Sequence, residues 1–344
     1  MSKKNLGQFY TTNNEYILQN LNIPDNINNI IEPFAGQGDL LNYLEKYNRI
    51  FNIECYDIDP KNNKLNIIKQ DTLLNPPDFN NKFVITNPPY LGRNKSKDKT
   101  YFDKYDQNDL YKCFIKILID NDCLGGILII PLNFWTTMRK QDISLRKLFL
   151  KKYKINRLNI FEENVFDDTN YTICAFQFEY CNDYNDNYDI YTDIYPSFTQ
   201  INLKLNNKNN YIIGGEIYQL KGNFKIERLT SKNKDKANTN ILLKCLDDNE
   251  NSKISLSYNK KHYIDNTPNL SARCYATLII EPQISDEEQH NLIKKFNSYI
   301  DDKRKKYHSL FLTNYRESKN NGFARKRISF TLAYDIISYL LTKL

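Results

Sequence analysis

The residues best suited to chemistry are four consecutive ones, Asn87-Pro88-Pro89-Tyr90, which follow directly after a short apolar run. Two prolines stop a strand and stiffen its end. We therefore expect the side-chain oxygen of Asn87 and the carbonyl oxygen of Pro88 to be two acceptors that point the same way, without a competing N–H. Two such acceptors suit an amine with two N–H donors, and Tyr90 offers a flat face for a heteroaromatic ring. An ordinary Pro-Pro turn is the alternative.

A glycine-containing turn lies earlier in the chain, at Glu32-Pro33-Phe34-Ala35-Gly36-Gln37-Gly38, between a predicted strand and a predicted helix. Glycines let the backbone approach a ligand closely at the start of a helix. The turn lacks the third glycine of the dinucleotide fingerprint, which argues against NAD. A tight strand-to-helix turn without a ligand is the alternative.

Two acidic positions follow the next two apolar runs. Asp57-Ile58-Asp59-Pro60 comes about 20 residues after the glycines, where a carboxylate can accept hydrogen bonds from ribose hydroxyls. Asp71-Thr72 follows the third run, and its carboxylate could accept from the amino group of an adenine. Taken alone, each position also fits a strand-end turn with a solvated carboxylate.

The elements that must position these residues alternate between strand and helix patterns, which is typical of a parallel α/β sheet. We predict strands at Ile27–Glu32, Ile53–Tyr56, Leu65–Lys69, Phe83–Thr86 and Ile127–Pro131, helices at Leu40–Tyr47 and Asp109–Ile119, and a closing pair of strands at Ile155–Ile160 and Thr172–Phe178. Gly36, Asp57, Asp71 and Asn87 then follow four successive strands. In a doubly wound sheet those strand ends share one edge, where ligands bind.

Around Cys181–Asn187 the composition changes to Asn, Asp and Tyr, so we predict two domains, 1–180 and 181–344. The second has the pattern of a smaller mixed α+β domain. Its predicted strands are Ile190–Ile194, Tyr211–Ile213, Phe224–Leu229 and Tyr275–Ile280, and its predicted helices are Ser285–Lys306 and Ser329–Leu344.

Composition excludes several classes of protein. Hydrophobic residues make up 40% of the 344 residues, which is enough for a packed core. Seven scattered cysteines without a Cys-x-x-Cys pair, and only three histidines, argue against a disulfide framework and a zinc site. No apolar run is long enough to cross a membrane and the first residues are polar, so we expect a cytoplasmic protein with no membrane contact.

Charge is distributed unevenly between the two predicted domains. Residues 1–180 hold 23 Lys and Arg against 22 Asp and Glu, a net charge of +1. Residues 181–344 hold 25 against 19, a net charge of +6. A basic second domain indicates contact with a polyanion.

In this order the motifs resemble those of the DNA adenine-N6 methyltransferases of the gamma arrangement, a family of type II restriction-modification methylases. Gly7-Gln8-Phe9-Tyr10-Thr11-Thr12 resembles that family's opening motif, residues 32–38 its cofactor loop and residues 87–90 its catalytic motif. Three later landmarks, Asn108 to Tyr111, Gly125 to Pro131 and Val165-Phe166, match in order. The resemblance covers residues 5–180. Thr12 stands where the family usually has Pro, and Asp57 where it usually has Glu.

The resemblance implies a Rossmann-like methyltransferase sheet that uses S-adenosylmethionine and no metal, followed by a domain that recognises a DNA target. The implied catalytic residues are Asn87, Pro88, Pro89 and Tyr90, with Phe166 stacking on the face of a flipped adenine opposite Tyr90. The implied cofactor-binding residues are Gln8, Tyr10, Thr11, Glu32, Phe34, Gly36, Gly38, Asp57, Ile58, Asp71, Thr72 and Asn87.

The expected partner is double-stranded DNA, bound by a monomer, with a cognate restriction endonuclease as a further candidate partner. The predicted DNA-contacting residues are Arg93, Arg304, Arg316, Arg325, Lys326 and Arg327. The polar loop Leu91–Asn108 either covers the flipped base when DNA binds or is a solvated surface loop. The look of the C-terminal stretch suggests a short palindromic target such as CATG.

Two other classes of function share these features. An RNA adenine methyltransferase or a protein glutamine methyltransferase would use the same Asn-Pro-Pro-Tyr core. A non-catalytic DNA-binding protein could retain the methylase fold.

Overall fold

The structure is a computed structural model that describes residues 13–62, 66–166, 171–182, 186–249, 251–264, 274–308, 310–317 and 324–344. The chain divides into two compact units, Met1–Tyr211 and Ile212–Leu344. No helix within these described ranges is long and apolar enough to cross a membrane.

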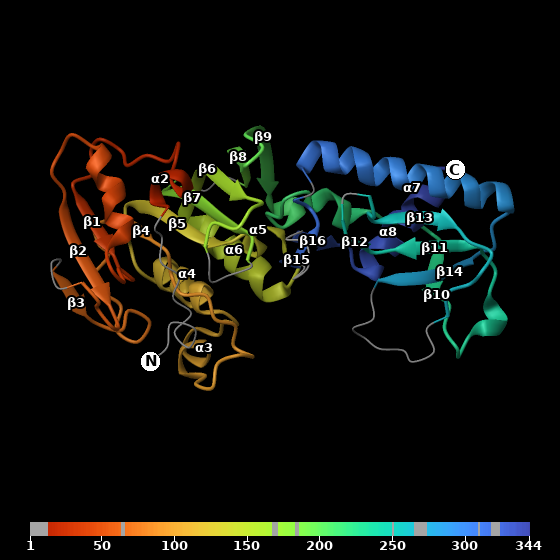
Figure 1. The fold of residues 1–344 in the computed structure, drawn as a ribbon, viewed down its shortest axis with the longest axis horizontal. Helices are drawn as coiled ribbons and strands as arrows, with labels where there is room; N and C mark the ends of the chain where they lie inside the picture. Colours follow the sequence, from red (N-terminus) through yellow and green to blue (C-terminus); the bar gives the residue numbers. More distant parts are fainter. Residues whose placement is uncertain are drawn as a thin grey trace. The chain divides into compact units, whose positions relative to one another are not determined.

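A nine-stranded mixed sheet with the order β3-β2-β1-β4-β5-β7-β6-β8-β9 forms the centre of the first unit (Figure 1). The first five strands in this order are parallel to one another, whereas β7 is antiparallel to both β5 and β6. This arrangement confirms the predicted doubly wound α/β fold. The strands are β1 Asn29–Glu32, β2 Asn52–Asp57, β3 Ile67–Lys69, β4 Phe83–Thr86, β5 Gly125–Pro131, β6 Tyr153–Phe161, β7 Ile173–Tyr180, β8 Asn187–Tyr195 and β9 Thr199–Asn206.

The central strands are apolar because both of their faces are covered. Every residue of β4 and β5 is buried, as expected for parallel strands within an α/β sheet. The helices of this unit are α2 Asn14–Ile17, η1 Asp39–Lys46, α3 Thr100–Tyr105, α4 Leu110–Asp120, α5 Asn133–Thr136, α6 Lys140–Lys152 and η2 Asn207–Asn209. The segment predicted as a helix at Leu40–Tyr47 is the 3-10 helix η1.

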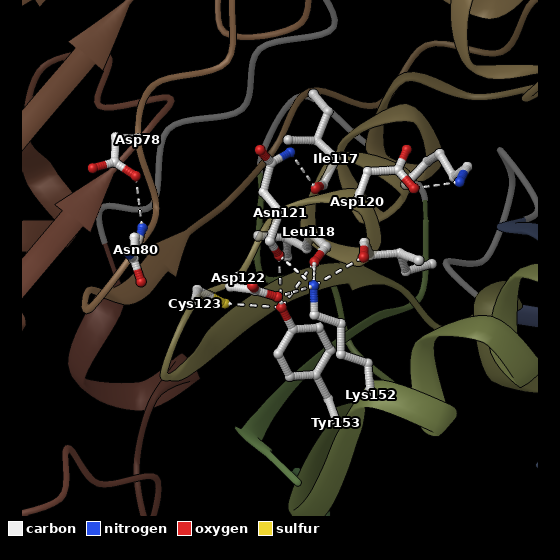
Figure 2. A network of polar contacts seen from close by, with 12 residues as sticks. Asp78, Asn80, Ile117, Leu118, Asp120, Asn121, Asp122, Cys123, Lys152 and Tyr153 are labelled. Carbon is white, nitrogen blue, oxygen red and sulfur yellow. Dashed lines mark hydrogen bonds and ion pairs between the residues drawn. The ribbon is translucent and has the colours of Figure 1, made fainter. Parts of the chain in front are cut away.

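The carboxyl end of α4 is fixed by the residues that end α6 and begin β6 (Figure 2). Lys152 Nζ donates to the carbonyl oxygens of Ile119 and Asn121, at 2.9 and 2.6 Å, and the Tyr153 hydroxyl donates to that of Leu118 at 2.8 Å. A cation near the last carbonyls of a helix also interacts favourably with the helix dipole.

The predicted domain boundary at 180/181 differs from the division seen in the structure, which falls between Tyr211 and Ile212. The cause is strand pairing: β8 pairs parallel to β6, and β9 pairs antiparallel to β8, so residues 187–206 extend the first sheet. The change of composition near 181 marks a connection within the sheet and not the end of the unit.

The second unit contains two antiparallel sheets and two long helices. Strands β10-β14-β11-β13 form one sheet and β12-β16-β15 the other. Helix α7 buries Leu292, Phe296 and Ile300, and it begins with a capping box in which Ser285 and Glu288 exchange hydrogen bonds. The elements are η3 Gly215–Gln219, β10 Lys225–Arg228, η4 Lys234–Lys236, β11 Ile241–Lys244, β12 Leu246–Asp247, β13 Ser255–Tyr258, β14 Tyr275–Glu281, α7 Asp286–Tyr307, β15 Thr313–Glu317, β16 Ala324–Arg327 and α8 Phe330–Leu341.

Candidate active site

The carboxyl ends of β1 and β4 meet where the strand order of the first sheet reverses. From this point the order runs β1-β2-β3 in one direction and β4-β5 in the other. Open α/β sheets bind ligands in the crevice beyond the strand ends at such a point. Glu32 ends β1 and Asn87 follows β4, and a hydrogen bond from the hydroxyl of Thr86 to Glu32 Oε1 joins the two strand ends.

The turn after β1 requires its two glycines. Gly36 has φ 57° and Gly38 has φ 85°, both in the left-handed region that residues with a Cβ rarely adopt. The turn is tied to β2 by the N–H of Ala35, which donates to the carbonyl oxygen of Tyr56 at 2.8 Å. Gly38 directly precedes η1, so the predicted strand–turn–helix unit is present.

Asp57 holds this turn from the end of β2. Its carboxylate accepts hydrogen bonds from the N–H groups of Gly36 and Asp59, each at 2.8 Å, and the residue is 3% exposed. A carboxylate has about four acceptor positions. These two hydrogen bonds therefore leave acceptor positions of Asp57 for ribose hydroxyls. The predicted role of Asp57 stays a prediction.

Glu32 is the most deeply buried acid at this edge, with an exposed fraction of 1%. Its Oε1 accepts from the N–H of Phe34 at 3.1 Å and from the hydroxyl of Thr86. Its Oε2 is buried and has no hydrogen-bond partner among the described residues. Burial raises the pKa of Glu32 to about 8, against the opposing effect of these two hydrogen bonds, and the nearby charge of Asp57 adds to the rise. Glu32 is thus a buried carboxyl group whose second oxygen has no hydrogen-bond partner among the described residues.

Asp71 and Thr72 connect the turn after β3 to two other parts of the site. Asp71 Oδ1 accepts from the N–H groups of Leu73 and Leu74, at 3.0 and 3.1 Å. The Tyr101 hydroxyl donates to the other oxygen, Oδ2, at 2.6 Å. Thr72 Oγ1 donates to the carbonyl oxygen of Pro33 in the glycine turn at 2.7 Å.

The residues that follow β4 form a rigid turn in which Asn87 and Tyr90 contact each other. The Tyr90 hydroxyl donates toward Asn87 Oδ1 and toward the carbonyl oxygen of Ile129 in β5, the latter at 2.7 Å. This contact fixes the amide oxygen of Asn87 from within the protein. Asn87 itself is partly exposed, and its role with the carbonyl of Pro88 as a pair of acceptors stays a prediction.

The two rings predicted to stack on a base are buried. Tyr90 is 3% exposed and Phe166 is 6% exposed. The Tyr90 ring lies edge-on to Tyr111 and Tyr171, with centroid distances of 6.0 and 6.4 Å. Stacking on a base therefore requires a side chain to move, and it stays a prediction.

The segment 91–108 is attached at both ends. Next to the turn 87–90, Asp109 Oδ1 accepts from the N–H of Leu91 at 3.1 Å and the N–H of Arg93 donates to the carbonyl oxygen of Asn108 at 2.9 Å. In its middle, helix α3 carries Tyr101, which contacts Asp71. The segment is an ordered connection between two turns of the site.

The predicted DNA-contacting residues have different surroundings. Arg304 donates to both carboxylate oxygens of Asp247, at 2.8 and 2.7 Å, and the two side chains are 13% and 5% exposed. Arg93 pairs with Asp103 at 2.6 Å in a more exposed position. Lys326 and Arg327 in β16 are partly exposed. DNA contact by Arg304 would require the loss of an internal ion pair.

Several predicted residues have no described side chain. Gln8, Tyr10 and Thr11 precede the first described residue. Arg316 and Arg325 lie in β15 and β16, and only their backbone is described. Their predicted roles stay predictions.

The structure also shows contacts that the sequence did not predict. Tyr101 contacts Asp71, Thr86 contacts Glu32, and Asp109 holds the start of the segment 91–108. Burial raises the pKa of Asp109 to about 6, against the opposing effects of Lys112 and of three backbone N–H groups. The only signals in the sequence were the position of Thr86 beside Asn87 and of Asp109 within the landmark 108–111.

The family comparison agrees with the motifs. Residues 7–166 match the model of a family described as Eco57I restriction-modification methylase. This match confirms the predicted resemblance to restriction-modification methylases for the part of the chain that holds the candidate site. No curated protein matches the chain.

Solved structures with a similar arrangement include a modification subunit of a putative type I restriction enzyme from Vibrio vulnificus YJ016, with 13% identity over 56% of this chain and 49% of that one and a TM-score of 0.43. A putative class I S-adenosylmethionine-dependent methyltransferase from Listeria monocytogenes has 18% identity over 54% of this chain and 62% of that one, with a TM-score of 0.40. This chain spans about half the length of the restriction-enzyme subunit.

Proposed function

We propose that the protein is a DNA methyltransferase of a restriction-modification system, which transfers a methyl group from S-adenosylmethionine to N6 of an adenine in duplex DNA. The observation that carries this proposal is the position of Asn87. Its amide oxygen is fixed by Tyr90 at the point where the strand order of the sheet reverses. The glycine turn lies beside this point, and the acids next to that turn can accept further hydrogen bonds.

The residues at the edge of the sheet fit the proposed cofactor. Glu32 Oε2 is a buried carboxyl oxygen with no partner among the described residues, and Asp57 and Asp71 each hold a turn while leaving acceptor positions open. A ligand rich in hydrogen-bond donors, with an amino acid, a ribose and an adenine, would satisfy such a set. When bound, S-adenosylmethionine supplies an electrophilic methyl group on a positively charged sulfur.

Asn87 and Pro88 would activate the nitrogen that receives the methyl group. The exocyclic nitrogen of adenine is a poor nucleophile because its lone pair is delocalised into the ring. When the two oxygens accept its two N–H groups, they favour a more tetrahedral nitrogen and stabilise the positive charge that develops during attack. The surplus proton then leaves to water. The bond from Tyr90 contributes by holding the amide oxygen in place before the substrate arrives.

A base in a duplex reaches this position only by leaving the helix. Flipping costs a few kcal/mol, and stacking on an aromatic ring returns about 1–3 kcal/mol per base. Because Tyr90 and Phe166 are both buried in the free protein, base entry is expected to displace Phe166 from its resting position.

The division of the chain supports contact between the second unit and a polyanion. Residues 212–344 hold 23 Lys and Arg against 15 Asp and Glu, a net charge of +8, whereas residues 1–211 hold 25 against 26, a net charge of −1. This asymmetry favours DNA over a protein side chain as the substrate, because phosphates dominate the affinity of nucleic-acid binding.

The proposal is tested by presenting the full-length protein with a tritiated methyl donor and three kinds of substrate, namely duplex DNA, structured RNA and a protein mixture. The expected result is label in duplex DNA alone, weakened as the salt concentration rises. Label in RNA or protein would show that the proposed substrate is wrong and would identify the actual one. Binding of the cofactor without transfer to any substrate would favour a non-catalytic protein.

A further inference from the structure

Tyr101 lies in the segment 91–108, and its side chain contacts Asp71. The proposed function assigns Asp71 to the adenine of the cofactor. Tyr101 lies on α3, 30 residues from Asp71, and its hydroxyl donates to Asp71 Oδ2 at 2.6 Å. Both side chains are partly exposed, so a ligand can reach the pair.

Helix α3 is anchored on this turn by neighbouring contacts as well. Lys104 Nζ donates to the carbonyl oxygen of Leu74 at 2.6 Å, and the Tyr105 hydroxyl donates to that of Leu73 at 2.6 Å. These contacts reach the backbone of the turn and do not involve the carboxylate of Asp71. Tyr101 therefore differs from its neighbours in that it contacts the carboxylate.

The hydrogen bonds at Asp71 determine which ligand groups its free positions can accept. Oδ1 accepts from two backbone N–H groups, and so both of its positions are used. Among the described residues, Oδ2 accepts a hydrogen bond from Tyr101 alone, so about one of its acceptor positions is left for a ligand. A fixed carboxylate oxygen favours a donor such as an amino group and disfavours a ligand that presents a carbonyl oxygen at the same place.

We propose that Tyr101 is a positioning residue that, through Asp71, makes the cofactor site select a purine with a 6-amino group over one with a 6-oxo group. This inference rests on the proposed function, because it assigns Asp71 to the purine of the cofactor. The Tyr101 hydroxyl holds Oδ2 in one direction, so its second acceptor position faces a fixed direction.

The experiment measures binding of S-adenosylhomocysteine and of its 6-oxo (inosyl) counterpart to the full-length protein by calorimetry. The wild-type protein is expected to bind the amino form at least about tenfold more tightly. Tyr101→Phe removes only the hydroxyl, and it is expected to reduce this ratio by about threefold to tenfold. Tyr105→Phe is the matched control: it loses a bond of the same length to the same turn, and its ratio is expected to equal that of the wild type.

Asp71→Asn gives a second measurement of the ratio between the two affinities. The two backbone N–H groups at Oδ1 would take the amide oxygen, which places the NH2 group at the position of Oδ2. The ratio is then expected to shift toward the 6-oxo ligand. Adding Tyr101→Phe to this variant is expected to change the ratio no further, because Tyr101 acts through the carboxylate.

The possible failures are distinguishable. No binding of either ligand would overturn the proposed function. Binding of both ligands with equal affinity in the wild-type protein would overturn the assignment of Asp71 and, with it, this inference. The role of Tyr101 would be overturned if Tyr101→Phe left the wild-type preference unchanged. It would also be overturned if Tyr101→Phe and Tyr105→Phe weakened the binding of both ligands equally, because that result would show only structural anchoring. Thermal unfolding of each variant shows whether the fold is retained.

Discussion

The edge of the first sheet and the basic second unit use their charged side chains in different ways. At the sheet edge, Asp57 and Asp71 each hold a turn by accepting backbone N–H groups, and each has acceptor positions left over. In the second unit, Arg304 is engaged in a bidentate pair with Asp247. Position at a strand end thus indicates a ligand-facing role more reliably than a cluster of basic residues does, because an arginine can be satisfied internally.

Removing Arg304 tests the second half of this comparison and has the largest expected effect on stability. Arg304→Ala would leave Asp247 buried without its partner, at a cost of about 3–5 kcal/mol in the free energy of unfolding. Urea denaturation measures this difference. Lys305→Ala is the control, since its 3.8 Å pair with Asp302 is exposed and no measurable change is expected. A stable Arg304→Ala protein with weakened DNA binding would instead identify Arg304 as a DNA contact.

Glu32 gives a prediction about pH at the sheet edge. Its pKa is raised to about 8 in the folded protein, from an ordinary value of 4.5. The protonated form is therefore favoured by folding, so its contribution is fully present below about pH 4.5 and is lost as the pH rises through about 8. Glu32→Gln removes this titration. We expect the melting temperature of the wild type to fall relative to that of Glu32→Gln between these pH values, and a constant difference would contradict the burial of an acid at this place.

Tyr90→Phe separates the ring of Tyr90 from its hydroxyl. The variant keeps the aromatic face but frees Asn87 Oδ1 and the carbonyl oxygen of Ile129 from their donor. We expect kcat for DNA methylation to fall about tenfold to a hundredfold, with unchanged affinity for the cofactor, because a single fixed donor or acceptor at a reacting centre has effects of this order. Stopped-flow measurement of a single turnover checks it. An unchanged rate would mean that the prolines alone orient Asn87.

The smallest expected effect concerns the segment 91–108. Arg93 pairs with Asp103 in an exposed position, with side chains 41% and 64% exposed. Such a pair contributes well below about 1 kcal/mol. Arg93→Ala should therefore leave the melting temperature unchanged, and any loss should appear in the affinity for DNA alone. A loss of stability would show that this pair, and not Asp109, holds the segment.

Much of the first sheet could be predicted because the local sequence and the fold agree there. The predicted strand Phe83–Thr86 is β4 as the structure has it, since an apolar run stopped by two prolines leaves few alternatives. Helix α6 was not predicted, because Asp142 and Arg146 are fully buried in it and interrupt the apolar pattern. The pairing of β8 with β6 depends on a partner about 30 residues away and has no local signal.

The same reasoning separates the predictable from the unpredictable part of the site. Gly36, Asp57, Asp71 and Asn87 follow four successive strands, so the topology alone brings them to one edge. The bond between Tyr101 and Asp71 could not be predicted, because it depends on how an irregular segment returns to the sheet. The burial of Tyr90 was also missed, since the motif does not reveal which rings pack around it.

In the proposed mechanism, Asn87 is the group that receives the amino nitrogen of adenine. The most direct test incubates duplex DNA with the full-length protein and S-adenosylmethionine, digests the DNA to nucleosides and measures the methylated bases by mass spectrometry. We expect N6-methyladenine from the wild type, and a loss of several orders of magnitude in Asn87→Ala while calorimetry shows that the cofactor still binds. Methylation by Asn87→Ala at the wild-type rate, or a methyl group on another base, would contradict the account.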